Sequence, residues 1–264
     1  MTTPYLNQTP EQSATPGKAQ TVLSSTAVHL WWLHLSRSAR VETTERLLSA
    51  DEQQRARRFR RPAAARQFCL GRALLRTILG SYLDLPPQRL RFAYTPNGKP
   101  YLPEAPHLMF SLAHAGDIGL LAVTCRRRVG VDVEIAHRRT NWRGLARRCL
   151  SDAAYRTLCP LPDEELRQAM TWYWVCHEAW LKARGEASLH RLLHIDLPWA
   201  GACIGCVSHI TMQDVSGQTW LARDVSRDGT RAALVVECVP DAGIEVLIFD
   251  RSLDWRWLPQ TYGL

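Results

Sequence analysis

The sequence has no apolar run that is long enough to span a membrane. One uncharged stretch, residues 197–213, is interrupted by Pro198, Gly201 and Gly205, and it falls short of the roughly 20 apolar residues that a transmembrane helix needs. The N-terminus does not combine a basic segment with an apolar run, as a secretory signal does. We therefore expect a cytoplasmic protein with no membrane-spanning segment.

The eight cysteines form no recognisable disulfide framework, and in a reducing cytosol we expect them to be buried thiols. The segment "CIGC" places Cys203 and Cys206 near His209, a set that could hold zinc. The second ligand pair of a structural zinc site is missing nearby, which favours thiols over a metal site.

Acidic residues are fewer than basic residues, with 25 Asp and Glu against 33 Lys and Arg, which gives a net charge of +8. This balance favours an acidic partner, such as a nucleic acid, a phosphorylated cofactor, an anionic membrane or an acidic protein. Eight arginines lie between Arg55 and Arg76. They indicate either a solvated helix face or contact with phosphate groups.

A hydrophobic fraction of 46% over 264 residues supports a folded core. The apolar patterns predict a first strand after residue 26, helices over residues 43–59 and 63–83, and then a group of strands. Further helices follow, with Ser151 as a cap and the longest over residues 163–185, closed by Gly185, and then more strands, one of them over residues 243–250. This order indicates an α+β fold of two similar halves, each with a small antiparallel sheet packed against helices. The expected segments are a disordered leader (1–26), an N-terminal half (27–129), a C-terminal half (130–250) and a tail (251–264).

Two carboxylates lie in a segment that otherwise reads as a buried strand, "GVDVEI". Alternate side chains share a face, so Asp132 and Glu134 point the same way, about 6–7 Å apart, while Val131, Val133 and Ile135 point into the core. This pair can seat Mg²⁺, which prefers oxygen ligands. An acidic outer face of a half-exposed strand is the alternative.

The segment "WVCHEAWLKARG" predicts a helix on which Glu178 and Lys182 lie one turn apart, separated by about 6 Å. A surface ion pair is the simplest interpretation. The tryptophans around them indicate a largely buried helix, where an unpaired carboxylate is costly and a metal ion would offset that cost. His114, at a predicted strand end in "FSLAHAG", is either structural or a donor to a phosphate.

The series "GKPYL", "FSLAHAG", "GVDVE" and "HEAWLKARG" closely resembles, in order and spacing, the motifs of the 4′-phosphopantetheinyl transferases, and in particular the larger Sfp-type branch, whose members are monomeric and pseudo-dimeric. The resemblance covers roughly residues 45–240. It implies a Mg²⁺-dependent enzyme that moves 4′-phosphopantetheine from coenzyme A to a serine of an acyl or peptidyl carrier protein and releases adenosine 3′,5′-bisphosphate. Such enzymes activate carrier proteins for fatty acid, polyketide or nonribosomal peptide synthesis.

The resemblance also implies roles for individual residues. Asp132, Glu134 and Glu178 match the magnesium ligands, and Lys182 matches the lysine near the phosphates. Glu178, Lys182 and Asp132 are the expected catalytic residues, with Glu178 as the candidate base for the serine proton. The expected coenzyme A contacts are Lys99, His114, Lys182, His177, Arg58, Arg66, Arg72 and Arg76.

Three positions depart from the family pattern. His177 stands where a lysine is usual, and we expect it to substitute at a secondary position. Ala154 stands where a glutamate is often the proposed base, with only Asp152 nearby. Ala187 stands where glycine is frequent, which makes the loop less permissive.

Two other functions stay open at this point. The departures at His177 and Ala154 motivate a weakened relative that binds coenzyme A or a carrier protein without efficient transfer. A nucleic-acid-binding protein would use the arginine-rich helices, but it leaves the buried acids unexplained. We therefore expect an acidic carrier protein and coenzyme A as partners of a monomer, without nucleic acid or membrane contact.

Overall fold

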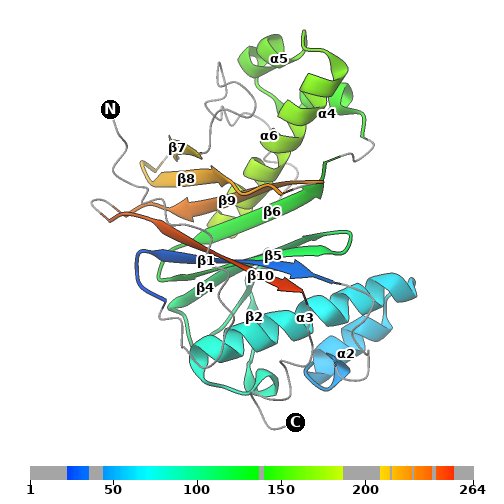
Figure 1. The fold of residues 1–264 in the computed structure, drawn as a ribbon, viewed down its shortest axis with the longest axis vertical. Coiled ribbons are helices and arrows are strands. Elements are labelled where there is room, and N and C mark those ends of the chain that lie inside the picture. The colour runs from blue at the N-terminus through cyan, green and yellow to red at the C-terminus, as the bar shows by residue number, and fades with distance from the viewer. Residues whose placement is uncertain are drawn as a thin grey trace.

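The computed structural model shows two four-stranded sheets stacked face to face, with a long helix on the outer side of each (Figure 1). The structure describes residues 23–35, 44–136, 140–186, 209–214, 216–227, 229–239 and 242–252. Within these residues, no helix combines the length and the apolar character that crossing a membrane requires.

The N-terminal half contains a sheet with the strand order β10-β1-β5-β4, in which β10 (Glu245–Ser252) is the last described strand of the chain. Its elements are β1 (Ala27–His34), α2 (Ala50–Arg57), α3 (Pro62–Leu83), η1 (Pro87–Arg89), β2 (Ala93–Tyr94), β3 (Pro100–Tyr101), β4 (Leu108–Ala115) and β5 (Ile118–Cys125). The last strand, β5, pairs antiparallel with the first strand, β1, and β4 lies at the edge of the sheet.

The C-terminal half repeats this plan with the strand order β6-β9-β8-β7. Its elements are β6 (Val129–Ile135), α4 (Trp142–Cys149), α5 (Asp152–Leu158), α6 (Asp163–Arg184), β7 (His209–Gln213), β8 (Thr219–Asp224) and β9 (Thr230–Glu237). Again the last strand, β9, pairs antiparallel with the first, β6. The repeated topology confirms the predicted α+β fold of two similar halves.

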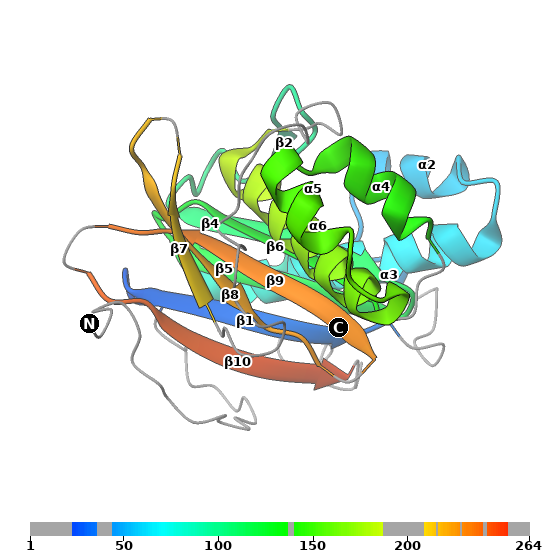
Figure 2. The same cartoon turned by 90° about the horizontal axis from the view of Figure 1, so that it is seen from above.

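The core consists of three apolar layers, of which the central one joins the two halves. Figure 2 shows α6 lying over β6 and β9 of the second sheet. The central layer lies between the two sheets and contains Leu30 from β1, Val131 from β6 and Leu234 from β9. A second layer packs α3 on the outer face of the first sheet, and a third packs α6 on the outer face of the second. The edge strands β4 and β6 are joined where the backbone N–H of Val131 donates to Ser111 Oγ at 3.2 Å.

The structure corrects two predictions of local structure. A helix was expected over residues 43–59, but α2 begins at Ala50 because Ser49 and Glu52 form a capping box. Val131 and Val133 are buried as expected, whereas Ile135 is 39% exposed, because it is the last residue of β6.

The predicted division of the chain also differs from the structure at its C-terminal end. Strand β10 (Glu245–Ser252) was expected in the C-terminal half, yet it pairs in parallel with β1 of the first sheet. The apolar pattern predicted this strand, but it carries no information on which sheet edge the strand joins.

Candidate functional site

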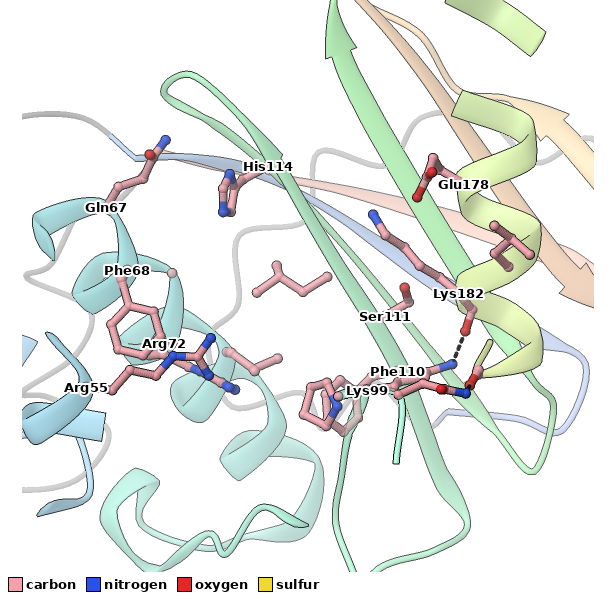
Figure 3. A pocket seen from close by; sticks show the side chains of 18 of the residues that line it. Arg55, Gln67, Phe68, Arg72, Lys99, Phe110, Ser111, His114, Glu178 and Lys182 are labelled. Carbon is pink, nitrogen blue, oxygen red and sulfur yellow. Dashed lines mark hydrogen bonds between the residues drawn. The ribbon is translucent and has the colours of Figure 1, made fainter. Parts of the chain in front are cut away.

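A cleft of about 710 Å³ lies between α3 and α6, over strand β4. Figure 3 shows side chains from both halves pointing into it. The lining includes Gln67, Phe68 and Arg72 from α3, Ser111 and His114 from β4, and Glu178 and Lys182 from α6. The motifs from the two halves of the sequence therefore meet at one cleft.

Asp132 is almost buried beside this cleft, with 8% of its surface exposed. Lys182 Nζ lies 2.7 Å from Asp132 Oδ1 and forms an ion pair with it. Burial raises the pKa of the Asp132 carboxyl, although Lys182 and His114 oppose the shift. Burial therefore has the larger effect on this pKa, and the neighbouring cations offset it only in part.

Glu178 lies close enough to Asp132 and Glu134 for their charges to affect its pKa. The pKa of Glu178 is raised by burial first, then by Asp132 and, more weakly, by Glu134, while Lys182 lowers it. Glu178 therefore interacts with both carboxylates of β6 and with the Lys182 ammonium. Among the described residues, no group of three His, Cys, Asp or Glu side chains is arranged closely enough to hold a metal ion.

This donor set nevertheless fits a hard divalent cation. Its three carboxylates supply the oxygen ligands that Mg²⁺ prefers, and their combined negative charge is larger than the one positive charge of Lys182, which pairs with Asp132. The raised pKa values of Asp132 and Glu178 indicate carboxylates that a further cation would stabilise.

A glycine allows strand β6 and helix α6 to approach each other closely. Gly130 precedes Asp132 and Glu134 on the face of β6 that meets α6, and a Cβ atom at Gly130 would lie 1.9 Å from Ala179 O and 2.5 Å from Ala183 N. Helix α6 therefore contacts the strand backbone directly. This close approach places Glu178 and Lys182 beside the carboxylates of β6.

The opposite wall of the cleft is cationic and aromatic. Arg72 Nη2 donates to Tyr94 Oη at 2.6 Å, and its guanidinium lies 5.8 Å from the Phe68 ring centroid. Arg55, on α2, lies 5.3 Å from the same centroid and also lines the cleft. His114 is exposed at the end of β4 and lies in the cleft. These groups can bind phosphate and stack on a planar ring.

The other predicted arginines lie elsewhere. Arg58 and Arg66 are not among the residues that line the cleft. Arg76 is 2% exposed, and its Nε lies 2.6 Å from Glu52 Oε2, while its Nη1 donates at 2.9 Å to two backbone carbonyls of residues 87 and 90. The predicted phosphate contact of Arg76 is therefore corrected to a structural role, because its donors are used inside the fold.

Lys99 borders the cleft, but its ammonium points at backbone carbonyls. Lys99 Nζ donates to Lys182 O at 2.5 Å (Figure 3) and to Val129 O at 3.1 Å. Burial lowers the pKa of Lys99 to about 8, with smaller effects from the charges of Arg128 and Lys182.

His177 is turned away from the cleft and has no exposed surface. It lies among aromatic side chains, with ring centroids 6.0 Å from Tyr173 and 6.2 Å from Trp180. The predicted coenzyme A contact of His177 is therefore corrected, since the residue belongs to the core of the C-terminal half. Ala154 and Asp152 lie on α5 and do not line the cleft. Ala187 and the "CIGC" segment lie outside the described residues.

The burial of His177 predicts a loss of stability in acid. Its pKa is lowered to about 4, so between pH 6.5 and 4 the unfolded chain binds a proton that the folded chain does not. The contribution of His177 to the free energy of unfolding should fall by roughly 3 kcal/mol as pH drops through this window, and His29, whose pKa burial also lowers to about 4, adds a separate loss. Urea denaturation at pH 7 and at pH 4.5 measures this loss of stability. His177→Phe should make the loss smaller, whereas the control His107→Gln, at an exposed position, should leave it unchanged. Equal pH dependence in all three proteins would contradict this origin.

The sequence alone did not identify several lining residues. Phe68 lies four positions before Arg72 on α3, and Arg72 was predicted to contact coenzyme A, so the face that the two residues share was a usable signal. Arg55 lies on another helix, and Ser111 lies on a different strand from the acids. Their approach to the cleft depends on the packing of separate elements, which local patterns do not specify.

Comparison with known proteins gives the same family for both halves of the chain. Residues 36–126 match a family model described as the N-terminal part of 4′-phosphopantetheinyl transferase. Residues 128–225 match the model of the 4′-phosphopantetheinyl transferase superfamily.

Several curated proteins are similar over most of their length. The chain is 37% identical over 175 residues to 4′-phosphopantetheinyl transferase HetI of Nostoc sp., covering 65% of this chain and 74% of HetI. It is 32% identical over 149 residues to AcpT of Escherichia coli K12, covering 55% and 70% of the two chains. With Sfp of Bacillus subtilis it shares 24% identity over 160 residues, covering 60% and 70%. The chain therefore belongs to the 4′-phosphopantetheinyl transferase superfamily, as an enzyme of the Sfp type.

Proposed function

We propose that this enzyme transfers the 4′-phosphopantetheine arm of coenzyme A to a serine of an acyl or peptidyl carrier protein. The observation that carries the proposal is the cleft itself, which has an acidic end at Glu178, where Lys182 links it to the buried Asp132, and a cationic, aromatic end at Arg55 and Phe68. Coenzyme A carries a diphosphate, a further phosphate and an adenine ring, which match these two ends.

The residues of the acidic end have distinct roles in the proposed reaction. The serine Oγ forms a bond to the phosphorus that carries the pantetheine arm, the bond to the bridging diphosphate oxygen breaks, and adenosine 3′,5′-bisphosphate leaves. Glu178 accepts the serine proton, a role that suits a carboxylate whose pKa burial has raised. Lys182 and His114 donate to phosphate oxygens as charge develops there.

Asp132, Glu134 and Glu178 would together hold Mg²⁺. When bound, the ion neutralises charge on the diphosphate oxygens, and it offsets the mutual repulsion of the carboxylates. Lys182 would then exchange part of its contact with Asp132 for a phosphate oxygen. The three carboxylates come from β6 and α6, so the whole ligand set lies within the C-terminal half.

We expect the enzyme to act as a monomer on an acidic carrier protein. Both walls of the cleft come from one chain, α3 on one side and α6 on the other, so a second copy is not needed to complete it. The net charge of +8 favours encounter with an acidic carrier protein.

The experiment is intact-protein mass spectrometry of apo carrier proteins incubated with the enzyme, coenzyme A and Mg²⁺. A panel of fatty-acid, polyketide and nonribosomal-peptide carriers should include at least one that gains the mass of the phosphopantetheine arm, and the gain should be lost with EDTA. Coenzyme A binding without any mass gain across the panel would instead support the weakened, binding-only relative.

Two arginines on α2 offer a matched test of the cationic end of the cleft. Arg55 lines the cleft, whereas Arg57, on the same helix, is exposed and does not. Arg55→Ala should raise the KM for coenzyme A by about tenfold, which corresponds to one lost charge-assisted contact of about 1.4 kcal/mol. Arg57→Ala should leave the KM unchanged. If both variants raise the KM for coenzyme A equally in steady-state assays, only the overall charge of the enzyme affects coenzyme A binding.

A further inference from the structure

Residues 95–99 form a compact turn that reaches from the N-terminal half to the end of α6. The turn joins β2 to β3 and contains Gly98 with a φ of +81°, a conformation that favours glycine. Gly98 N–H donates to Thr95 O at 2.8 Å, and Thr95 N–H donates to Lys99 O at 2.9 Å. These bonds make the turn a firm support for the side chains of Asn97 and Lys99.

Both side chains bind the C-terminal end of α6. Lys99 Nζ donates to Lys182 O at 2.5 Å, and Asn97 Nδ2 donates to Gly185 O at 2.9 Å. Carbonyls in the last turn of a helix lack partners within the helix, and a cation there also interacts favourably with the helix dipole. The N-terminal half thus supplies donors that the end of this helix requires.

The same ammonium also binds the strand beneath the helix, because Lys99 Nζ donates to Val129 O at 3.1 Å. Val129 is next to Gly130, at which α6 contacts the backbone of β6. One side chain therefore bridges the first residue of β6 and the last turn of α6. Lys182 is held at both ends, by Lys99 at its carbonyl (Figure 3) and by Asp132 at its ammonium.

We propose that Lys99 and Asn97 are positioning residues, which fix the end of α6 and thereby hold Lys182 across the cleft from the N-terminal half. This inference rests on the proposed function for its kinetic consequences. It differs from the direct coenzyme A contact that the family resemblance implies for Lys99, because two of the three N–H donors of Lys99 already bind the protein.

The structural part of the inference is tested by hydrogen exchange on the ligand-free enzyme. The amides of Gly185 and Glu186 donate to Lys182 O at 3.2 Å and to Leu181 O at 3.0 Å, so they report on the end of α6. Lys99→Met and Asn97→Ala should each accelerate their exchange by about tenfold. Arg57→Ala, at an exposed position on α2, is the control. Unchanged exchange in both variants would overturn the proposal whatever the enzyme transfers.

The kinetic part separates positioning from phosphate binding. Lys99→Met should lower kcat for carrier-protein modification at least tenfold while the Kd for coenzyme A, measured by calorimetry, stays within about threefold. Lys99→Arg should restore part of kcat. In a Lys182→Met background, Lys99→Met should lower kcat by less than about twofold, because its effect passes through Lys182.

The opposite pattern would overturn the proposal. A tenfold weaker Kd for coenzyme A with unchanged kcat would make Lys99 a direct phosphate contact. If the wild-type enzyme transfers nothing, the proposed function fails, but the exchange measurement still decides whether Lys99 positions α6.

Discussion

Asp132→Asn should lower phosphopantetheine transfer at least about 10³-fold and leave the circular dichroism spectrum unchanged. The substitution keeps the size of the side chain and an acceptor for Lys182, but it removes the negative charge. Loss of one group that stabilises transition-state charge typically costs 10²–10³-fold, and loss of a metal ligand adds to that cost. The rate of carrier-protein mass gain measures the effect.

A second aspartate provides the control for this prediction. Asp224 lies on β8 of the same sheet and does not line the cleft. Asp224→Asn should leave the transfer rate within about twofold. Transfer by Asp132→Asn within tenfold of wild type would remove Asp132 from the proposed metal site.

Gly130→Ala should destabilise the protein by about 4 kcal/mol or more and reduce transfer at the same time. The new Cβ would lie 1.9 Å from Ala179 O and 2.5 Å from Ala183 N. Both atoms belong to the backbone of α6, so no side-chain rotation relieves the overlap. Helix α6 must move, and Glu178 and Lys182 move with it relative to Asp132. Chemical denaturation measures the loss of stability.

Gly71→Ala is the matched control for the glycine substitution. Gly71 lies within α3, and no atom lies within 4 Å of the position that its Cβ would take. This variant should be as stable as wild type or up to about 1 kcal/mol more stable, because alanine favours helix. A Gly130→Ala protein that unfolds within 1 kcal/mol of wild type would show that α6 does not depend on the close approach.

Periodicity in the sequence was sufficient for most of the fold. The pattern over residues 163–185 predicted a helix closed by Gly185, and α6 ends at Arg184 with Gly185 in the left-handed conformation. The prediction of Ser151 as a helix cap is also confirmed, since its side chain accepts from Ala154 N. These features depend on neighbouring residues, which is why sequence reveals them.

Features that depend on tertiary packing were not predictable in the same way. Arg72 and Arg76 lie on one helix and both pair with Glu52, yet only Arg72 also lines the cleft. His177 and Glu178 are adjacent, yet one is in the core and the other faces the cleft. The motif spacing indicated the carboxylates Asp132, Glu134 and Glu178. The packing of α6 on Gly130 decides which other side chains lie beside them.

The central claim is that Asp132, Glu134 and Glu178 share one divalent cation in the presence of coenzyme A. Electron paramagnetic resonance of free Mn²⁺, used in place of Mg²⁺, measures this binding directly. The account predicts one tightly bound Mn²⁺ per wild-type chain, and affinity weakened at least about tenfold by Asp132→Asn, Glu134→Gln and Glu178→Gln. Equal Mn²⁺ affinity in the wild type and the three variants would contradict it.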